Sequence, residues 1–140
     1  MSFQIVTTTY AQHKSGIQQV RRKVFIEEQG IDPMLEWDEH DAMATFAIAV
    51  DAQDQVIGTA RLLNHGKIGR MAVLPEYRHQ GVGTALLLHL LDIAKQHGHT
   101  QIMLAAQQTV MGFYLKQGFM PIGPAHNEAG IPHQNMQRPI

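Results

Sequence analysis

A turn near the middle of the chain has the residue types that bind phosphate. Gly81 and Gly83 stand where a strand pattern changes to the apolar spacing of a helix, and Arg78 precedes them. The first turn of a helix has unpaired N–H groups and the positive end of the helix dipole, so it attracts anions. Glycine lets a pyrophosphate approach the backbone closely, and a guanidinium adds a charge-assisted contact. One interpretation of this turn is therefore a phosphate site; the other is close packing of a helix against a sheet.

The spacing of this turn excludes two other nucleotide-binding motifs. It lacks the GxxxxGK[ST] pattern of a P-loop. It also lacks the third glycine of a dinucleotide-binding fingerprint, and the strands before it are joined by hairpins rather than helical crossovers. The chain has no cysteine, which excludes disulfides, thiolate metal sites and a cysteine nucleophile.

Nine histidines are scattered along the chain. They form no HExxH motif and have no paired carboxylate at ligand spacing. Asp38, His40, His126 and His133 could converge in space, but scattered surface positions are the favoured interpretation. We therefore expect no metal site.

The periodicity of apolar residues orders the elements that must position the turn. Residues 31–41 carry Pro33 and several acids and are predicted to form an exposed loop. The predicted strands cover 3–8, 45–50, 56–63, 68–74, 101–105 and, in the tail, about 133–138, and the predicted helices cover 14–28, 80–97 and 109–117.

This order, βαβββαβαβ, predicts an α+β fold with a mixed, mostly antiparallel sheet flanked by helices. Short polar turns join the strands at 45–50, 56–63 and 68–74, so these strands should be antiparallel. A helical crossover joins 68–74 to 101–105, which should make those two strands parallel. The absence of repeats and linkers predicts a single domain over residues 1–140.

Composition limits the classes of partner. Hydrophobic residues make up 44% of the 140 residues and charged residues 16%, which is typical of a folded globular chain. The 11 basic and 12 acidic residues give no basic excess, so nucleic acid and anionic membranes are not expected as partners. No apolar run approaches the ~20 residues of a membrane span, and no signal peptide is visible. A cytoplasmic location is the expectation.

Three sequence blocks resemble the GNAT superfamily of N-acetyltransferases. Residues 78–83, RHQGVG, resemble its R/Q-x-x-G-x-G/A signature, and RMAVLPEYR before them resembles the strand and bend that lead into it. FYLKQGF at 113–119 resembles its FYxxxGF block. VFIEEQGI at 24–31 and EAGIPH at 128–133 resemble the ElaA-type branch of small bacterial acetyltransferases.

The resemblance implies splayed parallel strands at the centre of the sheet and binding of acetyl-CoA, with its pyrophosphate on the glycine turn. It also implies direct transfer of the acetyl group to a primary amine in a ternary complex. Many members have Asn where this chain has Gln107. The expected coenzyme contacts are Met71, Ala72, Val73, Arg78, His79, Gln80, Gly81, Val82, Gly83, Thr84, Gln107, Phe113 and Tyr114.

Two catalytic groups follow from this resemblance. The backbone N–H of Val73 is expected to stabilise the oxyanion, because a gap between splayed strands leaves ladder donors unpaired. Tyr114 is the candidate general acid, since a phenol with a pKa of ~10 can protonate a thiolate whose thiol has a pKa of ~8.5.

The general base and the acceptor site are expected among the acids and histidines near the first helix and the tail. Glu28 is the candidate base. The alternatives are Glu27, Glu36, Asp38, Asp41, Glu128 and His133, with His40 and His79 behind them. Clustered carboxylates would attract a small cationic amine; the other interpretation is that they form a solvated loop face. The expected substrate-binding residues are Glu28, Glu36, Asp38, Asp41 and His133.

An acetyl-CoA-dependent N-acetyltransferase acting on a small-molecule amine is the leading hypothesis. The alternative is a coenzyme A-binding protein without its own catalysis, acting as a sensor or partner subunit. Small members of this superfamily often self-associate, so a homodimer is a further expectation.

Overall fold

The structure, a computed structural model, describes residues 2–140. The strands are β1 (Gln4–Thr8), β2 (Thr45–Val50), β3 (Val56–Leu62), β4 (Ile68–Val73), β5 (Gln101–Gln107), β6 (Met120–Pro121), β7 (His126–Glu128) and β8 (Ile131–Pro139). The α-helices are α1 (Tyr10–Arg21), α2 (Pro33–Glu36), α3 (Val82–Gln96) and α4 (Met111–Lys116), with a π-helix η1 (Arg22–Glu28) and 3₁₀ turns η2 (Glu39–Met43), η3 (Pro75–Tyr77) and η4 (Gln108–Val110).

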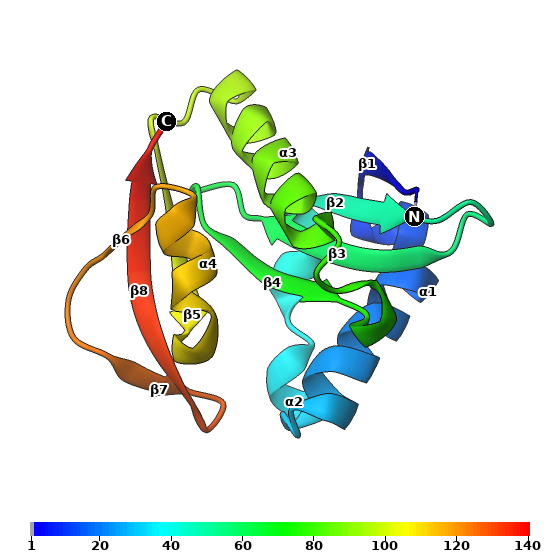
Figure 1. Ribbon diagram of the computed structural model, residues 1–140, viewed down its shortest axis with the longest axis horizontal. Coiled ribbons are helices and arrows are strands. Elements are labelled where there is room, and N and C mark those ends of the chain that lie inside the picture. Colours follow the sequence, from blue (N-terminus) through cyan, green and yellow to red (C-terminus); the bar gives the residue numbers. More distant parts are fainter. Residues whose placement is uncertain (1) are drawn as a thin grey trace.

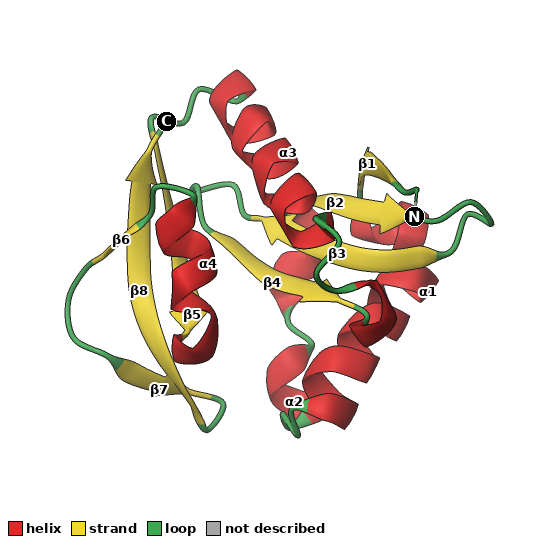
Figure 2. Cartoon of the chain, viewed as in Figure 1, coloured by secondary structure: helices red, strands yellow, loops and turns green. Residues whose placement is uncertain are grey.

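The first four strands form an antiparallel sheet in the order β1-β2-β3-β4 (Figure 1). This confirms the predicted hairpins. Side chains alternate between the two faces of β2. Phe46 and Ile48 pack with Ile17 of α1, whereas Ala47 belongs to the core cluster that contains Leu86 of α3. The two helices therefore cover opposite faces of the sheet, as Figure 2 shows.

The remaining strands form a second antiparallel sheet in the order β5-β8-β6, with β7 paired to β8. The parallel arrangement of β4 and β5 is confirmed, but within residues 2–140 only one parallel bridge joins the sheets, between Lys67 and Met103. Beside it, the N–H of Met103 donates to the carbonyl of Gly66 at 3.0 Å. Beyond that point the sheets diverge, as Figure 1 shows.

Three sequence predictions need correction. The helix predicted over 14–28 begins at Tyr10, because the Thr9 hydroxyl accepts from the N–H of Gln12 and caps it, and it continues as the π-helix η1. The segment 31–41 is not an exposed loop but contains α2 and η2, with two of its acids buried. The last strand covers all of Ile131–Pro139, because β5 pairs with its residues 133–139 and β7 with its residues 131–133. No helix within residues 2–140 is long and apolar enough to cross a membrane.

Candidate active site

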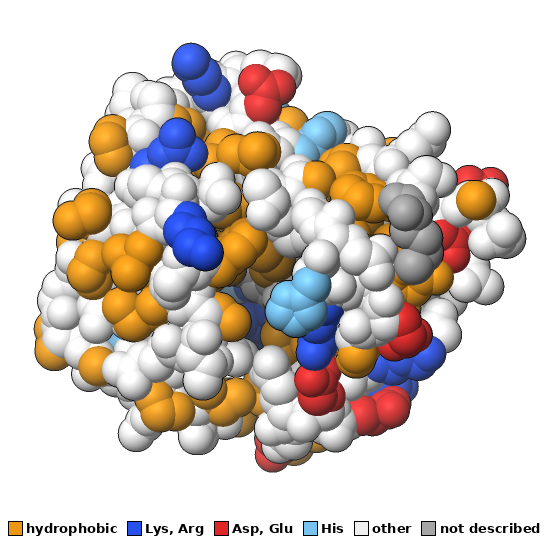
Figure 3. All heavy atoms as spheres, viewed as in Figure 1, with side chains coloured by type: hydrophobic (Ala, Val, Ile, Leu, Met, Phe, Trp, Pro, Cys, Tyr) orange, Lys and Arg blue, Asp and Glu red, His pale blue; other side chains and the backbone are white. Residues whose placement is uncertain are grey.

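The gap between the two sheets opens a cleft of about 1070 Å³, visible as the hollow near the centre of the face in Figure 3. Three residues predicted for the site, Glu28, Asp41 and Gln80, do not line it. The predicted residues that do line it are Glu36, Asp38, Met71, Ala72, Val73, Arg78, His79, Gly81, Val82, Gly83, Thr84, Gln107, Phe113, Tyr114 and His133.

The glycine turn presents free backbone donors to this cleft. Gly81 caps α3 with φ of +87°, and no side chain accepts from the first N–H groups of the helix. An added Cβ at Gly81 would meet nothing within 4 Å, and one at Gly83 would meet only Phe113 and Val73, from 3.7 Å outward. The open space and the uncapped donors fit a phosphate group. Gln80 turns away, its amide donating to the carbonyl of Glu76.

Arg78 holds this turn against the end of β4 and against η1. Its Nε donates to the carbonyl of Val73 at 3.0 Å, and Nη1 and Nη2 form a bidentate pair with Glu28 at 2.8 and 2.7 Å. The hydrogen bond from Arg78 lowers the pKa of Glu28. A carboxylate that is paired in this way and lies outside the cleft is poorly suited to the role of base that the sequence suggested for it.

Backbone groups of β4 face the gap. The N–H of Leu74 donates to Ile57 in β3 at 2.9 Å, so by strand alternation the N–H and C=O of Val73 point away from β3. The hydrogen bond from Arg78 to the Val73 carbonyl agrees with this direction. A register shift in the β3–β4 pairing falls at Arg70, whose φ is +48°, and the backbone beyond this bulge continues beside the open edge.

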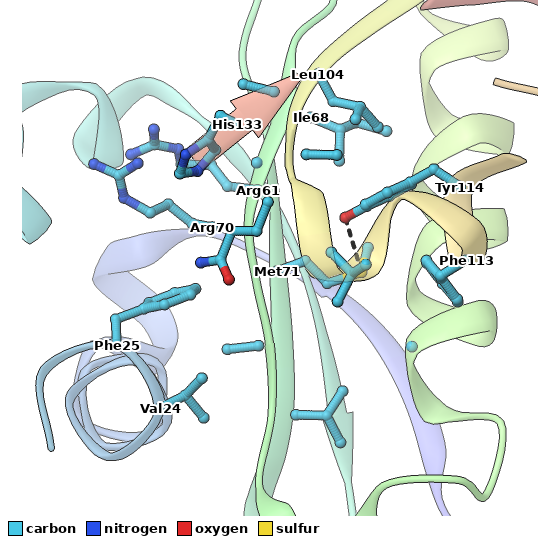
Figure 4. A pocket seen from close by; sticks show the side chains of 18 of the residues that line it. Val24, Phe25, Arg61, Ile68, Arg70, Met71, Leu104, Phe113, Tyr114 and His133 are labelled. Carbon is cyan, nitrogen blue, oxygen red and sulfur yellow. Dashed lines mark hydrogen bonds between the residues drawn. The ribbon is translucent and has the colours of Figure 1, made fainter. Parts of the chain in front are cut away.

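Tyr114 lies on the α4 side of β4, with Phe113 (Figure 4). Its hydroxyl donates to the Met71 sulfur at 3.7 Å, and its ring makes edge contacts with Phe113 and Phe119. Burial raises the pKa of Tyr114 to about 12. The phenol therefore retains its proton beside the backbone gap.

Across β4 from Tyr114, Figure 4 places Phe25, Arg61, Arg70 and His133. The acids predicted for the acceptor site lie on this side, but they are held by arginines. Arg21, which is fully buried, donates to Glu36 at 2.6 Å.

The other acids of this group are paired as well. Asp41 accepts from Arg21 at 2.7 Å and from Arg61 at 3.0 Å, and Asp38 accepts from Arg61 at 2.8 Å and from Arg70 at 3.1 Å. We call these five residues, together with Glu36, the arginine–carboxylate cluster. Its three positive and three negative formal charges cancel, so it offers no excess of negative charge to attract a cationic amine.

His133 is buried, with 8% of its surface exposed, at the end of the cleft near β7. Its Nδ1 lies 2.7 Å from the Ile131 carbonyl. A carbonyl can only accept, so Nδ1 carries the hydrogen and Nε2 of the neutral ring is an acceptor. Nε2 lies 3.7 Å from a Glu128 carboxylate oxygen. In this tautomer the Nε2 lone pair is not used by the backbone hydrogen bond.

Sequence reasoning missed Gln29, Arg61 and Arg70, which line the cleft. Gln107 donates to Gln29 at 2.8 Å and so links the two walls. These residues belong to no local motif, because their partners are distant in sequence. No group of three or more potential metal-ligating side chains occurs within residues 2–140.

The sequence matches the family model of the acetyltransferase (GNAT) domain over residues 9–139. The uncharacterized protein YyaT of Bacillus subtilis (strain 168) is 34% identical over 145 residues, covering 100% of this chain and 97% of that protein. An acyl-CoA N-acyltransferase from Pseudomonas aeruginosa has a TM-score of 0.86 at 27% identity, covering 98% of this chain and 99% of its own. Escherichia coli ElaA has a TM-score of 0.86 at 25% identity, with the same coverage of 98% and 99%.

These likenesses confirm the predicted resemblance to GNAT proteins and to ElaA, and with it the predicted fold class. The protein is a transferase, and the chain belongs to the GNAT acetyltransferase family.

Proposed function

We propose that this protein transfers an acetyl group from acetyl-CoA directly to a primary amine, in a ternary complex. The observation that carries the proposal is the gap beside β4, which brings the backbone of Val73 and the hydroxyl of Tyr114 to one cleft with the uncapped start of α3. When bound, acetyl-CoA supplies an acetyl group already activated as a thioester.

The turn residues bind the coenzyme. The N–H groups of Val82, Gly83 and Thr84 donate to the pyrophosphate, and the helix dipole adds to the attraction. The backbone groups of β4 that face the gap bind the amides of the pantetheine arm. Arg78, anchored by Glu28, holds the turn in the shape that these contacts need.

Three groups of the chain act in the reaction: one accepts a proton, one stabilises the developing negative charge and one donates a proton. The amine nitrogen bonds to the acetyl carbon while its proton moves to Nε2 of His133, directly or through water. The N–H of Val73 donates to the carbonyl oxygen as negative charge develops there. The C–S bond breaks, and Tyr114 protonates the departing sulfur and regains its proton from solvent. The chain has no cysteine to accept the acetyl group, which supports direct transfer.

Calorimetry with acetyl-CoA tests the proposal, using a matched pair of glycine variants. Gly81 and Gly98 both have φ of +87° and open space around an added Cβ, but only Gly81 lies on the cleft. The wild type and Gly98→Glu should bind acetyl-CoA, and Gly81→Glu should not, because its carboxylate occupies the phosphate position. Release of coenzyme A thiol with a panel of primary amines then tests catalysis. Equal binding by the two variants, or no binding by the wild type, would contradict the proposal.

A further inference from the structure

One side chain in the cleft has a buried donor with no partner. The Arg61 side chain is only 6% exposed, and its buried Nε makes no hydrogen bond. Buried polar groups in native proteins are nearly always hydrogen-bonded, and leaving a charged one unpaired is costly. The orphaned donor belongs to a residue that lines the cleft, which points to a ligand atom as its partner.

The unused part of the Arg61 guanidinium has the shape of a carboxylate site. Both hydrogen bonds of the side chain use Nη1, to Asp38 and Asp41, so Nε and Nη2 remain free. These two nitrogens form one edge of the planar group, and two parallel N–H donors match the two oxygens of a carboxylate.

Arg70 adds a second unused donor nearby. Its hydrogen bonds use Nε and Nη2, to the carbonyls of Leu35 and Glu36 and to Asp38, and none uses Nη1. Burial lowers the pKa of Arg70, and the neighbouring Arg61 lowers it further. Since the acids of the cluster already have arginine partners, another anionic oxygen would stabilise both guanidinium groups.

We propose that the acceptor carries a carboxylate as well as the amine, and that Arg61 and Arg70 bind this carboxylate. The acceptor thus belongs to the amino-acid class. The inference rests on the proposed acetyl transfer. His133, on the same side of β4, then faces the amine end of the acceptor (Figure 4).

Matched acceptors test the inference on the wild-type protein. Each amino acid is compared with its primary amide and its decarboxylated amine, at α, β and γ spacings of amine and carboxylate, with saturating acetyl-CoA. A charge-assisted pair predicts a kcat/KM at least about tenfold higher for the best carboxylate than for its two analogues. Arg61→Lys, which keeps the charge but loses the free edge, should remove this preference. Arg22→Lys, outside the cleft, should keep it.

A binding measurement separates failure of this inference from failure of the proposed function. Calorimetry measures the binding of an N-acetyl amino acid, and of its amide, to the protein loaded with coenzyme A. Preferential binding of the carboxylate, lost in Arg61→Lys, supports the site even where no amine is acetylated. Acetylation of the amides and decarboxylated amines as fast as the amino acids overturns the inference and leaves acetyl transfer standing. An absence of both turnover and carboxylate binding overturns it as well. The wild-type comparisons decide these outcomes if Arg61→Lys does not fold.

Discussion

At the scale of single residues, the Tyr114 phenol is the group that we propose as proton donor to the departing sulfur. Its pKa of about 12 keeps it protonated at every working pH. Tyr114→Phe should lower kcat by about 10- to 100-fold, because the departing sulfur loses its proton donor. The affinity of the Tyr114→Phe variant for acetyl-CoA, measured by calorimetry, should stay within about twofold of the wild type, because the ring and its aromatic contacts remain. An unchanged kcat would show that another group protonates the sulfur.

Glu28 and His133 are the two candidates for the general base, and we expect their substitution to have different effects on kcat. Glu28 is paired with Arg78 and its pKa is lowered, so Glu28→Gln should keep kcat and the acidic limb of its pH profile. Glu27→Gln, at the neighbouring exposed position, is the matched control. His133→Gln should lower kcat at least about tenfold, because the amine loses its proposed proton acceptor. The assignment is wrong if kcat falls in Glu28→Gln and not in His133→Gln.

The site was predictable from sequence where a local motif carries it. The glycine turn and Tyr114 belong to short blocks, and both lie on the cleft as expected. Arg61 and Arg70 were not predictable, because each is defined by contact with Asp38, which is 23 or 32 positions away in sequence. A lone arginine in a strand does not indicate which carboxylate it meets.

At the scale of elements, the arginine–carboxylate cluster joins α2 and η2 to the end of α1 and to strands β3 and β4. Arg21→Met would leave Glu36 and Asp41 buried without their central cation. We expect a loss of about 3–5 kcal/mol in the free energy of unfolding at pH 8. Arg22→Met is the control, since Arg22 is exposed and stacks on the same ring of Trp37.

The loss in Arg21→Met should depend on pH. Burial already raises the pKa of Glu36, and Arg21 is a main influence that lowers it. Without Arg21 the folded-state pKa rises further, so the stability of the variant is greatest below the pKa of an unfolded Glu and falls as the pH rises. Denaturant unfolding should show a smaller loss at pH 5 than at pH 8. An equal loss at both values would mean that the carboxylates are compensated elsewhere.

Close packing of α1 on β3 gives a second prediction about elements. A Cβ at Gly16 would clash with Cγ2 of Val56, so Gly16→Ala requires the helix or strand to shift. We expect a loss of about 1–3 kcal/mol in the free energy of unfolding. In a Val56→Ala background the same change should be neutral or stabilising by up to ~1 kcal/mol, because alanine favours the helix. A similar loss in both backgrounds would show that this contact is not the cause.

Elements with a local signal were predicted correctly, such as the hairpins of the first sheet and the helix α3. The segment 31–41 was not, because acids in a row normally indicate solvent. Glu36 and Asp41 are buried only since Arg21, in another helix, is buried opposite them. The π-helix has no distinctive sequence pattern of its own in this chain.

At the scale of the whole molecule, the two sheets share a single parallel bridge among the residues that the structure describes, between Lys67 and Met103. A ligand in the cleft contacts both sheets and should stabilise their association. At a free acetyl-CoA concentration of 100 times Kd we expect about 2.7 kcal/mol of stabilisation, or a rise of roughly 5–10 °C in Tm. Hydrogen exchange should slow in both β4 and β5. Gly98→Glu should show the same rise and Gly81→Glu none; a rise in both variants would place the ligand elsewhere.

The backbone gap beside β4 also has a consequence for which mutations the enzyme tolerates. Where a chemical step uses an N–H group, almost any side chain at that position supplies the same donor. A saturation library at Val73 would then be filtered mainly by packing, and apolar residues of similar size should pass. Proline alone removes the N–H. In such a library the catalytic importance of position 73 would therefore appear as the absence of proline among the active variants. It would not appear as a requirement for valine.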